Sequence, residues 1–234
     1  MFNSLSILIP AYNIEETIEL VVVHAQKMGK SIAKKLEIVV VDDGSTDTTP
    51  QILKTLQKKI PELRIVTHQQ NQGYGMSIKD LYYAGTMEWL LTLPGDDQIE
   101  PDEAKKLVPY ADRYGMILGK RKKRGDHLFR IIQSKTYNAL LKVLFNIPTT
   151  DVNTIRLMKQ EIMKNVTLTM TSPFVDAELV LKTNRLHYPI LEVEIEHKPR
   201  KTAGATGGKF FKTILPTFID VLSFFFTSVF HVGR

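Results

Sequence analysis

The 234-residue chain contains no cysteine. This absence excludes disulfide frameworks, thiolate metal sites and cysteine nucleophiles, and it is compatible with a reducing cytosol. The N-terminus lacks a basic leader and its first apolar run stops at Pro10, so no secretory signal is expected. The six histidines show no metal-ligand spacing. We therefore expect a cytoplasmic protein without thiol chemistry.

The formal net charge is +6, and the basic excess is local. Residues 119–142 alone carry a net charge of +7. Such a cluster favours a phosphate-rich partner, either a nucleotide diphosphate, an anionic membrane or a nucleic acid, although single lysines of this kind are also typical of a solvated loop. A nucleic acid is disfavoured because no aromatic side chain interleaves the cluster before Phe129. Acidic strand ends elsewhere in the chain would also repel a phosphate backbone.

The first half of the chain alternates short apolar runs with helical patterns. Runs rich in Ile, Val and Leu predict strands of a buried parallel sheet at Leu5–Pro10, Leu36–Val41, Leu63–His68, Trp89–Leu93 and, as a fifth, Met116–Gly119. Crossover helices are predicted at Glu15–Met28, Thr48–Lys59 and Ser77–Gly85. Repeated strand–helix–strand units predict an α/β fold, a mostly parallel sheet flanked by helices.

The rhythm changes after Gly119. A basic, mostly helical stretch runs to Phe145, and the segments after it predict a strand at Val152–Met158, a helix at Phe174–Asn184 and a strand at Ile190–His197. No internal repeat or low-complexity linker divides the chain. We therefore expect residues 1–209 to form one continuous domain.

The last segment, Phe210–Val232, is rich in Phe and contains only two charged residues, Lys212 and Asp220. It is nearly as long as a membrane span, but Pro216 and Asp220 lie inside it. Three interpretations are open: a helix packed on the core, an interfacial amphipathic helix and a true span. The interfacial helix is favoured narrowly over the core helix, and the span comes third.

Polar segments follow the first four predicted strands, at Pro10–Asn13, Asp42–Asp47, Asn71–Gly75 and Pro94–Gln98. Ligands of an open parallel sheet bind outside the carboxyl ends of its strands, so these segments predict a site at one edge. Asp42 and Asp43 offer hydrogen-bond acceptors to a base N–H or to ribose hydroxyls. Gly73 and Gly75 let the backbone approach a ligand closely.

Asp96 and Gln98 lie two residues apart, so in an extended chain they would face the same side. Both offer the hard oxygen ligands that suit Mg²⁺ or Mn²⁺. A metal there would clamp a diphosphate and stabilise the charge that develops on the leaving group. Each of the four polar segments alone is also an ordinary turn or helix-start signal, and their joint placement is what favours a site.

Four segments in order resemble the signatures of family 2 glycosyltransferases: Ile7–Asn13 (ILIPAYN), Val41–Asp47 (VDDGSTD), Asn71–Gly75 (NQGYG) and Gly95–Gln98 (GDDQ). The resemblance covers roughly the first hundred residues. It implies a GT-A-like fold with a Rossmann-like nucleotide-binding half, a nucleotide-sugar donor and an inverting, metal-assisted transfer. Residues 1–119 would then be the nucleotide-sugar half and residues 120–209 the acceptor half, followed by a Phe-rich helix in residues 210–234.

By matched position, the resemblance assigns the nucleotide sugar to Pro10, Tyr12, Asn13, Asp42, Asp43, Gly73, Gly75 and Asp96. It assigns the metal, Mg²⁺ or Mn²⁺, to Asp96 with Gln98. The family usually carries Asp-x-Asp where this chain has Pro94-Gly95-Asp96, so the first aspartate is missing. Asp97 is then a substitute ligand, and a binding module that has lost catalysis is an alternative.

The second half resembles the dolichol- and polyprenyl-phosphate sugar transferases more loosely, at Gly119–Arg121, Asp151–Leu157 and His197–Arg200. This resemblance implies that Arg121, Arg156 and Arg200 contact phosphates of donor and acceptor, with Arg200 among the catalytic residues. An ordinary ion pair would equally explain Arg156. Asp176 falls where family members carry a carboxylate near the acceptor, although the start of a surface helix needs no function for it.

Two acceptor classes stay open. A lipid phosphate is already anionic and needs no general base, whereas a hydroxyl needs a carboxylate, for which Asp176 is the nearest candidate. We favour a polyprenyl phosphate as acceptor, with the enzyme peripheral at the cytoplasmic membrane face. A nucleotidyltransferase is disfavoured because residues 11–16 lack a Gly-rich, basic loop. A glycosidase is disfavoured because it needs no nucleoside pocket.

Overall fold

The computed structural model describes residues 1–122, 128–198 and 210–230, with side chains for 1–122, 133–198 and 214–227. Seven strands form one sheet in the order β3-β2-β1-β4-β6-β5-β7. The strands are β1 (Phe2–Ala11), β2 (Ala33–Asp42), β3 (Leu63–Thr67), β4 (Trp89–Thr92), β5 (Met116–Arg121), β6 (Arg156–Lys159) and β7 (Ile190–Ile195). Only β6 pairs antiparallel, with β4 and β5. The expected mostly parallel α/β sheet is confirmed.

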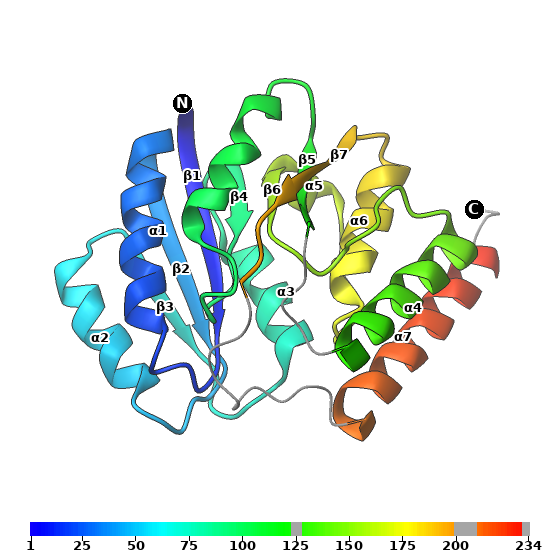
Figure 1. Ribbon diagram of the computed structural model, residues 1–234, viewed down its shortest axis with the longest axis horizontal. Helices are drawn as coiled ribbons and strands as arrows, with labels where there is room; N and C mark the ends of the chain where they lie inside the picture. Colours follow the sequence, from blue (N-terminus) through cyan, green and yellow to red (C-terminus); the bar gives the residue numbers. More distant parts are fainter. Residues whose placement is uncertain (123–127, 199–209, 231–234) are drawn as a thin grey trace.

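Helices cover both faces of the sheet (Figure 1). They are α1 (Ile18–Ile32), α2 (Thr49–Lys59), α3 (Tyr74–Ala84), α4 (Leu128–Phe145), α5 (Glu161–Asn165), α6 (Val175–Arg185) and α7 (Phe210–Phe230), with 3₁₀ turns η1 (Pro101–Lys106) and η2 (Val108–Tyr110). The α1 and α2 helices pack on one face, and α3, α4, α6 and α7 pack on the other. Along β1, Leu5, Ile7 and Ile9 face the first layer and Leu8 faces the second, as the two-residue period of a strand requires.

One predicted strand is shorter than expected. The pattern at Val152–Met158 predicted a strand, but only Arg156–Lys159 forms β6. The guanidinium Nη2 of Arg156 donates to the carbonyl of Val152 at 2.6 Å. That carbonyl is therefore bonded to a side chain instead of to a neighbouring strand. Residues 152–155 form an irregular segment beside the site as a result.

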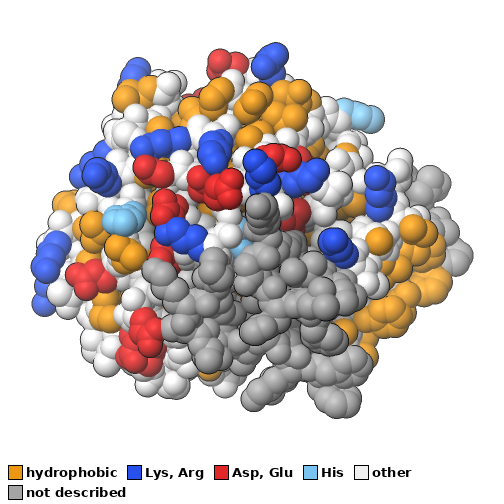
Figure 2. All heavy atoms as spheres, viewed as in Figure 1, with side chains coloured by type: hydrophobic (Ala, Val, Ile, Leu, Met, Phe, Trp, Pro, Cys, Tyr) orange, Lys and Arg blue, Asp and Glu red, His pale blue; other side chains and the backbone are white. Residues whose placement is uncertain are grey.

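The α7 helix has one buried face and one exposed face. Val221 and Phe224 are buried, and the Phe224 ring meets Phe145 and Phe174 edge-on at 5.5 and 5.4 Å between centroids. The opposite face carries large apolar side chains that are between 37% and 55% exposed, here called the apolar stripe: Leu215, Phe218, Ile219, Leu222 and Phe226. Figure 2 shows hydrophobic side chains at the edge of the molecule where Figure 1 places α4 and α7.

Within the described residues, no helix combines the length and the hydrophobicity that crossing a bilayer requires. The α7 helix combines features of a core helix and of an interfacial helix, since its inner face packs on the core and its outer face is apolar and exposed.

Glu37 of β2 is the centre of a polar cluster at the end of the sheet opposite to Asp42. Its carboxylate accepts hydrogen bonds from Ser6 Oγ at 2.6 Å, Arg64 Nη2 at 3.0 Å and Thr86 N at 3.1 Å. Burial raises the pKa of Glu37, but these three donors outweigh burial and bring the pKa below its ordinary value of 4.5. The cluster therefore stabilises the folded state through the ionised carboxylate.

We expect Glu37→Gln to lower the free energy of unfolding by about 1–3 kcal/mol at neutral pH, because hydrogen bonds to a charged acceptor are the stronger ones. The pKa of Glu37 is lower in the folded protein than in the unfolded chain. Its contribution is therefore present above about pH 4.5 and is lost as the pH falls through the lowered folded value. Urea denaturation of both proteins across this range measures the difference, which should shrink in acid. A difference that stays constant in acid would contradict this role.

Candidate functional site

The carboxyl ends of the first four strands lie at one edge of the sheet, as the sequence predicts. The β1 strand pairs in parallel with both β2 and β4, and β2 pairs in parallel with β3. The pairing continues past the strand ends, where Asp43 N donates to Ala11 O at 2.8 Å and His68 N donates to Asp42 O at 2.9 Å. The four polar segments are thereby brought together.

The loops after β1 and β2 are bonded to each other. Asn13 Oδ1 accepts from Thr46 N at 2.8 Å, and Asn13 N donates to Ser45 Oγ at 3.0 Å. Asn13 adopts a left-handed backbone with φ of 49°, which Asn tolerates better than most residues. Its side chain thus connects the two loops. The neighbouring Tyr12 is 40% exposed and offers an open ring at the site.

Asp42 and Asp43 are both buried, and each carboxylate has a backbone partner. Asp42 Oδ1 accepts from Ser45 N at 3.1 Å, which closes the turn after β2. Asp43 accepts from Gln72 N and Gly73 N, both at 2.9 Å. Asp43 therefore fixes the loop after β3 to the end of β2, a role that the sequence alone did not indicate.

His68 lies between two carboxylates. Its Nδ1 is 2.7 Å from Asp43 Oδ1, and its Nε2 is 3.1 Å from Asp80 Oδ2 on α3. His68 is 8% exposed and Asp43 is 3% exposed, so their contact is shielded from water, whereas the Asp80 side chain is 39% exposed. His68 and Asp80 were not predicted as site residues. They add a second connection between Asp43 and the helix that follows the Asn71–Gly75 loop.

The two predicted glycines of this loop differ in what surrounds them. Gly73 has φ of 91°, a conformation that favours glycine, and no described atom lies within 4 Å of a β-carbon built there. A β-carbon at Gly75 would lie 2.1 Å from Thr171 O and 2.4 Å from Ser172 O. The loop is therefore open at Gly73, whereas the close approach at Gly75 is made by the chain itself.

The chain turns at the predicted metal site. Asp97 has φ of 56°, and Gln98 N donates to Asp96 Oδ1 at 3.2 Å. The chain is therefore not extended here, which was the condition under which Asp96 and Gln98 would face the same side. The turn nevertheless holds Asp96 and Gln98 next to each other, and two non-glycine residues of the site, Asn13 and Asp97, now have left-handed backbones, as is common at functional sites.

The residues at this turn fit a hard cation. The Gln98 side chain is 5% exposed, and its amide oxygen is the atom that would bind a cation. Its amide nitrogen has no hydrogen-bond partner among the described residues and, as a donor, would suit a phosphate oxygen. Mg²⁺ is usually held by one or two carboxylates together with substrate phosphates, so a full protein cage is not needed. The described residues contain no cluster of three His or acidic side chains that would form such a cage. Asp96 and the amide of Gln98 match the smaller donor set.

Asp176 on α6 is the centre of a buried network. Its Oδ1 accepts from Tyr82 OH at 2.7 Å and lies 3.0 Å from Arg156 Nη2. Its Oδ2 accepts from Tyr74 OH at 2.9 Å and from Asn153 Nδ2 at 3.1 Å. Asp176 is 1% exposed and Arg156 is 0% exposed. The network therefore joins the Asn71–Gly75 loop, through Tyr74, to β6 and α6.

The network fixes the charge of its members. Tyr74 as a whole is 44% exposed, but its hydroxyl lies against the buried carboxylate of Asp176. Removal of the two hydroxyls from water raises the pKa of Tyr74 and of Tyr82 well above the usual value, so both stay protonated and act as donors. Burial alone would lower the pKa of Arg156, but the neighbouring Asp176 carboxylate reverses the direction and the pKa lies above its usual value. The guanidinium therefore stays charged.

The arginines predicted to contact phosphates have carboxylate partners or lie outside the described residues. Arg121 donates to Asp151 through Nε and Nη2, both at 2.7 Å. Arg156 forms an ion pair with Asp176 inside the buried network, which agrees with the alternative explanation of Arg156 as an ordinary ion pair. Arg200 lies outside the described residues. Lys198, two positions before it, donates its N–H to Gln98 O at 2.8 Å, which places Lys198 beside the Asp96–Gln98 turn.

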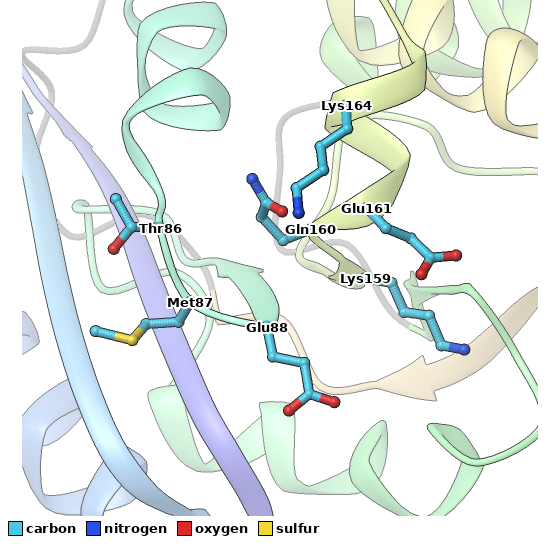
Figure 3. A pocket seen from close by; sticks show the side chains of 7 residues that line it. All are labelled: Thr86, Met87, Glu88, Lys159, Gln160, Glu161 and Lys164. Atoms are coloured by element: carbon cyan, nitrogen blue, oxygen red, sulfur yellow. The ribbon is translucent and has the colours of Figure 1, made fainter.

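A surface pocket of about 370 Å³ lies at the other end of β4 (Figure 3). It is lined by Thr86, Met87, Glu88, Lys159, Gln160, Glu161 and Lys164. Trp89 at the start of β4 pairs with Lys159 at the end of β6, which places the pocket at the edge opposite to the polar strand ends. It is not part of the candidate site.

The sequence model described as glycosyl transferase family 2 matches residues 6–171, more than half of the chain. The chain belongs to this family. Among family 2 relatives, the undecaprenyl-phosphate 4-deoxy-4-formamido-L-arabinose transferase of Pectobacterium atrosepticum is 33% identical over 143 residues, which cover 60% of this chain and 43% of the relative. The enzyme of the same description from Photorhabdus laumondii is 32% identical over 142 residues, with 59% and 43% covered. The chain thus spans less than half the length of these relatives.

Solved structures show the same fold. Glucosyl-3-phosphoglycerate synthase of Mycobacterium tuberculosis, in complex with Mn²⁺, uridine diphosphate and phosphoglyceric acid, matches with a TM-score of 0.73 at 17% identity, covering 94% of this chain and 78% of that chain. The same enzyme with Mg²⁺ and uridine diphosphate matches with a TM-score of 0.69 at 16% identity, covering 93% and 79%. The expectation of a GT-A-like fold is therefore confirmed.

Proposed function

We propose that this family 2 protein transfers a sugar from a nucleotide-sugar donor to a polyprenyl phosphate, assisted by Mg²⁺ or Mn²⁺. The observation that carries the proposal is the gathering of four polar strand ends at one sheet edge, with the Asp43-bound loop beside β2 and the Asp96–Gln98 turn after β4. The names of the relatives specify undecaprenyl phosphate as their acceptor, which supports the same acceptor class here.

The donor would bind across the ends of β1, β2 and β3. Tyr12 offers an exposed ring to a base, and Gly73 leaves open space beside the loop backbone. Asp43 keeps that backbone in place through its bonds to Gln72 and Gly73. Asp96 and Gln98 would hold the metal, which when bound neutralises charge on the leaving diphosphate.

The state of Asp176 favours a phosphate acceptor over a hydroxyl. A hydroxyl acceptor requires a carboxylate within reach that can take its proton. Asp176 is buried, and both of its oxygens accept hydrogen bonds or face Arg156. It would have to leave Tyr74 or Asn153 to act as a base. A phosphate acceptor is already anionic and makes no such demand.

Peripheral binding to a membrane is the third part of the proposal. The apolar stripe supplies the surface for the interface, and the basic segment at residues 119–142 supplies attraction to anionic lipids. Val143 on α4 is 82% exposed and extends the apolar surface. Lys and Arg side chains lie beside the hydrophobic surface in Figure 2. We propose that this side of the molecule faces the cytoplasmic leaflet.

The experiment that tests the proposed donor is a thermal-shift screen of nucleoside diphosphates, each with and without Mn²⁺. A ligand that binds only the folded state raises Tm by mass action. At a free ligand concentration of 100 times the Kd, it stabilises the folded state by about 2.7 kcal/mol. We expect one base to raise Tm, and to do so only with the metal present. Equal, negligible shifts for all bases with Mn²⁺ would refute the donor assignment.

Polar substitution of the apolar stripe should release the protein from anionic vesicles. We expect the double variant Phe218→Gln, Ile219→Gln to lose about tenfold or more in vesicle affinity, because two exposed apolar side chains no longer enter the interface. The matched control is Leu20→Gln, Val23→Gln on α1, where both side chains are 42% exposed and face away from the stripe's helix. Sedimentation with phosphatidylserine vesicles at low salt measures the vesicle affinity of both double variants. Equal binding of the two variants would contradict the stripe's role.

A further inference from the structure

Asp220 is an acidic residue in an otherwise apolar stretch of α7. Its hydrogen-bond partners explain why a carboxylate occurs there. Its Oδ2 accepts hydrogen bonds from Thr171 N at 3.2 Å and from Ser172 N at 3.0 Å. The carboxylate thus faces the body of the protein instead of the apolar stripe. It binds α7 to the short segment before α6.

The segment Thr171–Ser172 also contacts the donor side of the molecule. The carbonyl oxygens of both residues lie so close to Gly75 that a β-carbon there would meet them at 2.1 and 2.4 Å. Ser172 is also bonded to the chain that leads into α6, since its Oγ accepts from Phe174 N at 3.2 Å and its carbonyl accepts from Val175 N at 3.0 Å. The segment is therefore wedged between α7, α6 and the first turn of α3.

The first turn of α3 continues directly into the donor loop. Gly73, two residues before Gly75, is bonded to Asp43 through its N–H. Tyr74 lies between the two glycines and donates to Asp176 on α6. A displacement of the segment at Thr171–Ser172 would therefore move the backbone that the proposed donor must contact.

We propose that Asp220 is a positioning residue that couples the docking of α7 to the donor-binding loop at Asn71–Gly75. The proposal rests on the proposed function, because it assumes that this loop binds the nucleotide. Loss of the Asp220 contacts frees the Thr171–Ser172 segment, and Gly75 loses the surface that fixes the loop. Coupling between sites is reciprocal, so nucleotide binding must in turn tighten the docking of α7.

The test measures binding of the uridine, guanosine, adenosine, cytidine and thymidine diphosphates, each with Mn²⁺, to the full chain by calorimetry. Asp220→Ala should weaken the affinity about tenfold, within the usual range of coupling between sites. Asp220→Asn keeps one oxygen for both backbone N–H groups and should stay within about threefold of the wild type. Gly75→Ala displaces the same segment from the other side and should also weaken binding about tenfold.

Glu37→Gln is the matched control, because it destabilises the protein from the opposite end of the sheet and should leave the affinity within about twofold. Hydrogen exchange gives a second readout: nucleotide with Mn²⁺ should slow the exchange of α7 amides in the wild type and not in Asp220→Ala. If the wild type binds none of the five diphosphates, the proposed function fails and the coupling with it. If the wild type binds and Asp220→Ala binds equally well, or if Glu37→Gln weakens binding as much, the coupling alone is refuted.

Discussion

Replacing Asp176 with alanine is expected to lower the free energy of unfolding by about 3–5 kcal/mol, the usual loss when one partner of a buried ion pair is removed. Arg156 is 0% exposed and would keep its charge without the carboxylate that lies 3.0 Å away. The Tyr74 and Tyr82 hydroxyls would lose their acceptor as well. Urea denaturation followed by circular dichroism measures the loss.

Two comparisons make the expectation specific. Asp112→Ala removes an exposed carboxylate and should change stability by no more than about 0.5 kcal/mol. The double variant Asp176→Leu, Arg156→Met removes both charges of the pair, and it should be more stable than Asp176→Ala because no buried charge is left unpaired. If the single and double variants are equally stable, the ion pair is not what Asp176 contributes.

Asp176→Asn then separates the two acceptor classes. The amide keeps the size of the side chain and one acceptor oxygen, so part of the network survives. With a phosphate acceptor, turnover of the folded variant should stay within about tenfold of the wild type, because no base is lost. A loss of more than about a hundredfold with unchanged acceptor binding would instead match the loss of a general base and indicate a hydroxyl acceptor.

The fold was predictable because its signals are local. The central strands β1, β2 and β4 are largely buried on both faces, so each appears as a short apolar run in the sequence, and the helices between them begin or end within a few residues of the predicted bounds. The polar segments after these strands needed only the parallel arrangement to come together. The exception is β6, which begins only at Arg156, while the carbonyl of Val152 before it accepts from the Arg156 guanidinium.

The site was less predictable because its contacts join residues far apart in the chain. Nothing local marks His68 or Asp80 as partners of Asp43, and nothing local marks Asn153 as a partner of Asp176. For the residues that the sequence did select, it does not show which carboxylate oxygens the protein itself already uses. Asp220 is the clearest case, because its partners lie 48 and 49 positions away.

The predicted metal site poses a different difficulty, because its geometry depends on the local backbone conformation. The spacing of Asp96 and Gln98 was interpreted with an extended chain, but the left-handed backbone at Asp97 turns the chain and joins the two residues by a hydrogen bond from Gln98 N. Asp96 and Gln98 are therefore neighbours because the chain turns between them, and not because it is extended. Whether Asp96 or Asp97 would bind the metal depends on which of the two carboxylates faces it.

Asp96→Ala is expected to abolish the Mn²⁺-dependent part of nucleotide binding and to lower kcat/KM by about a hundredfold or more. The reason is that a small hard cation held by few protein ligands cannot lose its carboxylate and stay bound, and even outer-shell partners of a metal contribute 10–100-fold. Calorimetric titration of nucleoside diphosphate with and without Mn²⁺ measures the first effect independently of activity. Asp97→Asn is the matched comparison, because asparagine tolerates the φ of 56° at this position and keeps the turn. It should retain metal-dependent binding if Asp96 is the ligand. The opposite result, with binding kept in Asp96→Ala and lost in Asp97→Asn, would make Asp97 the substitute for the aspartate that this family usually carries two positions before Asp96.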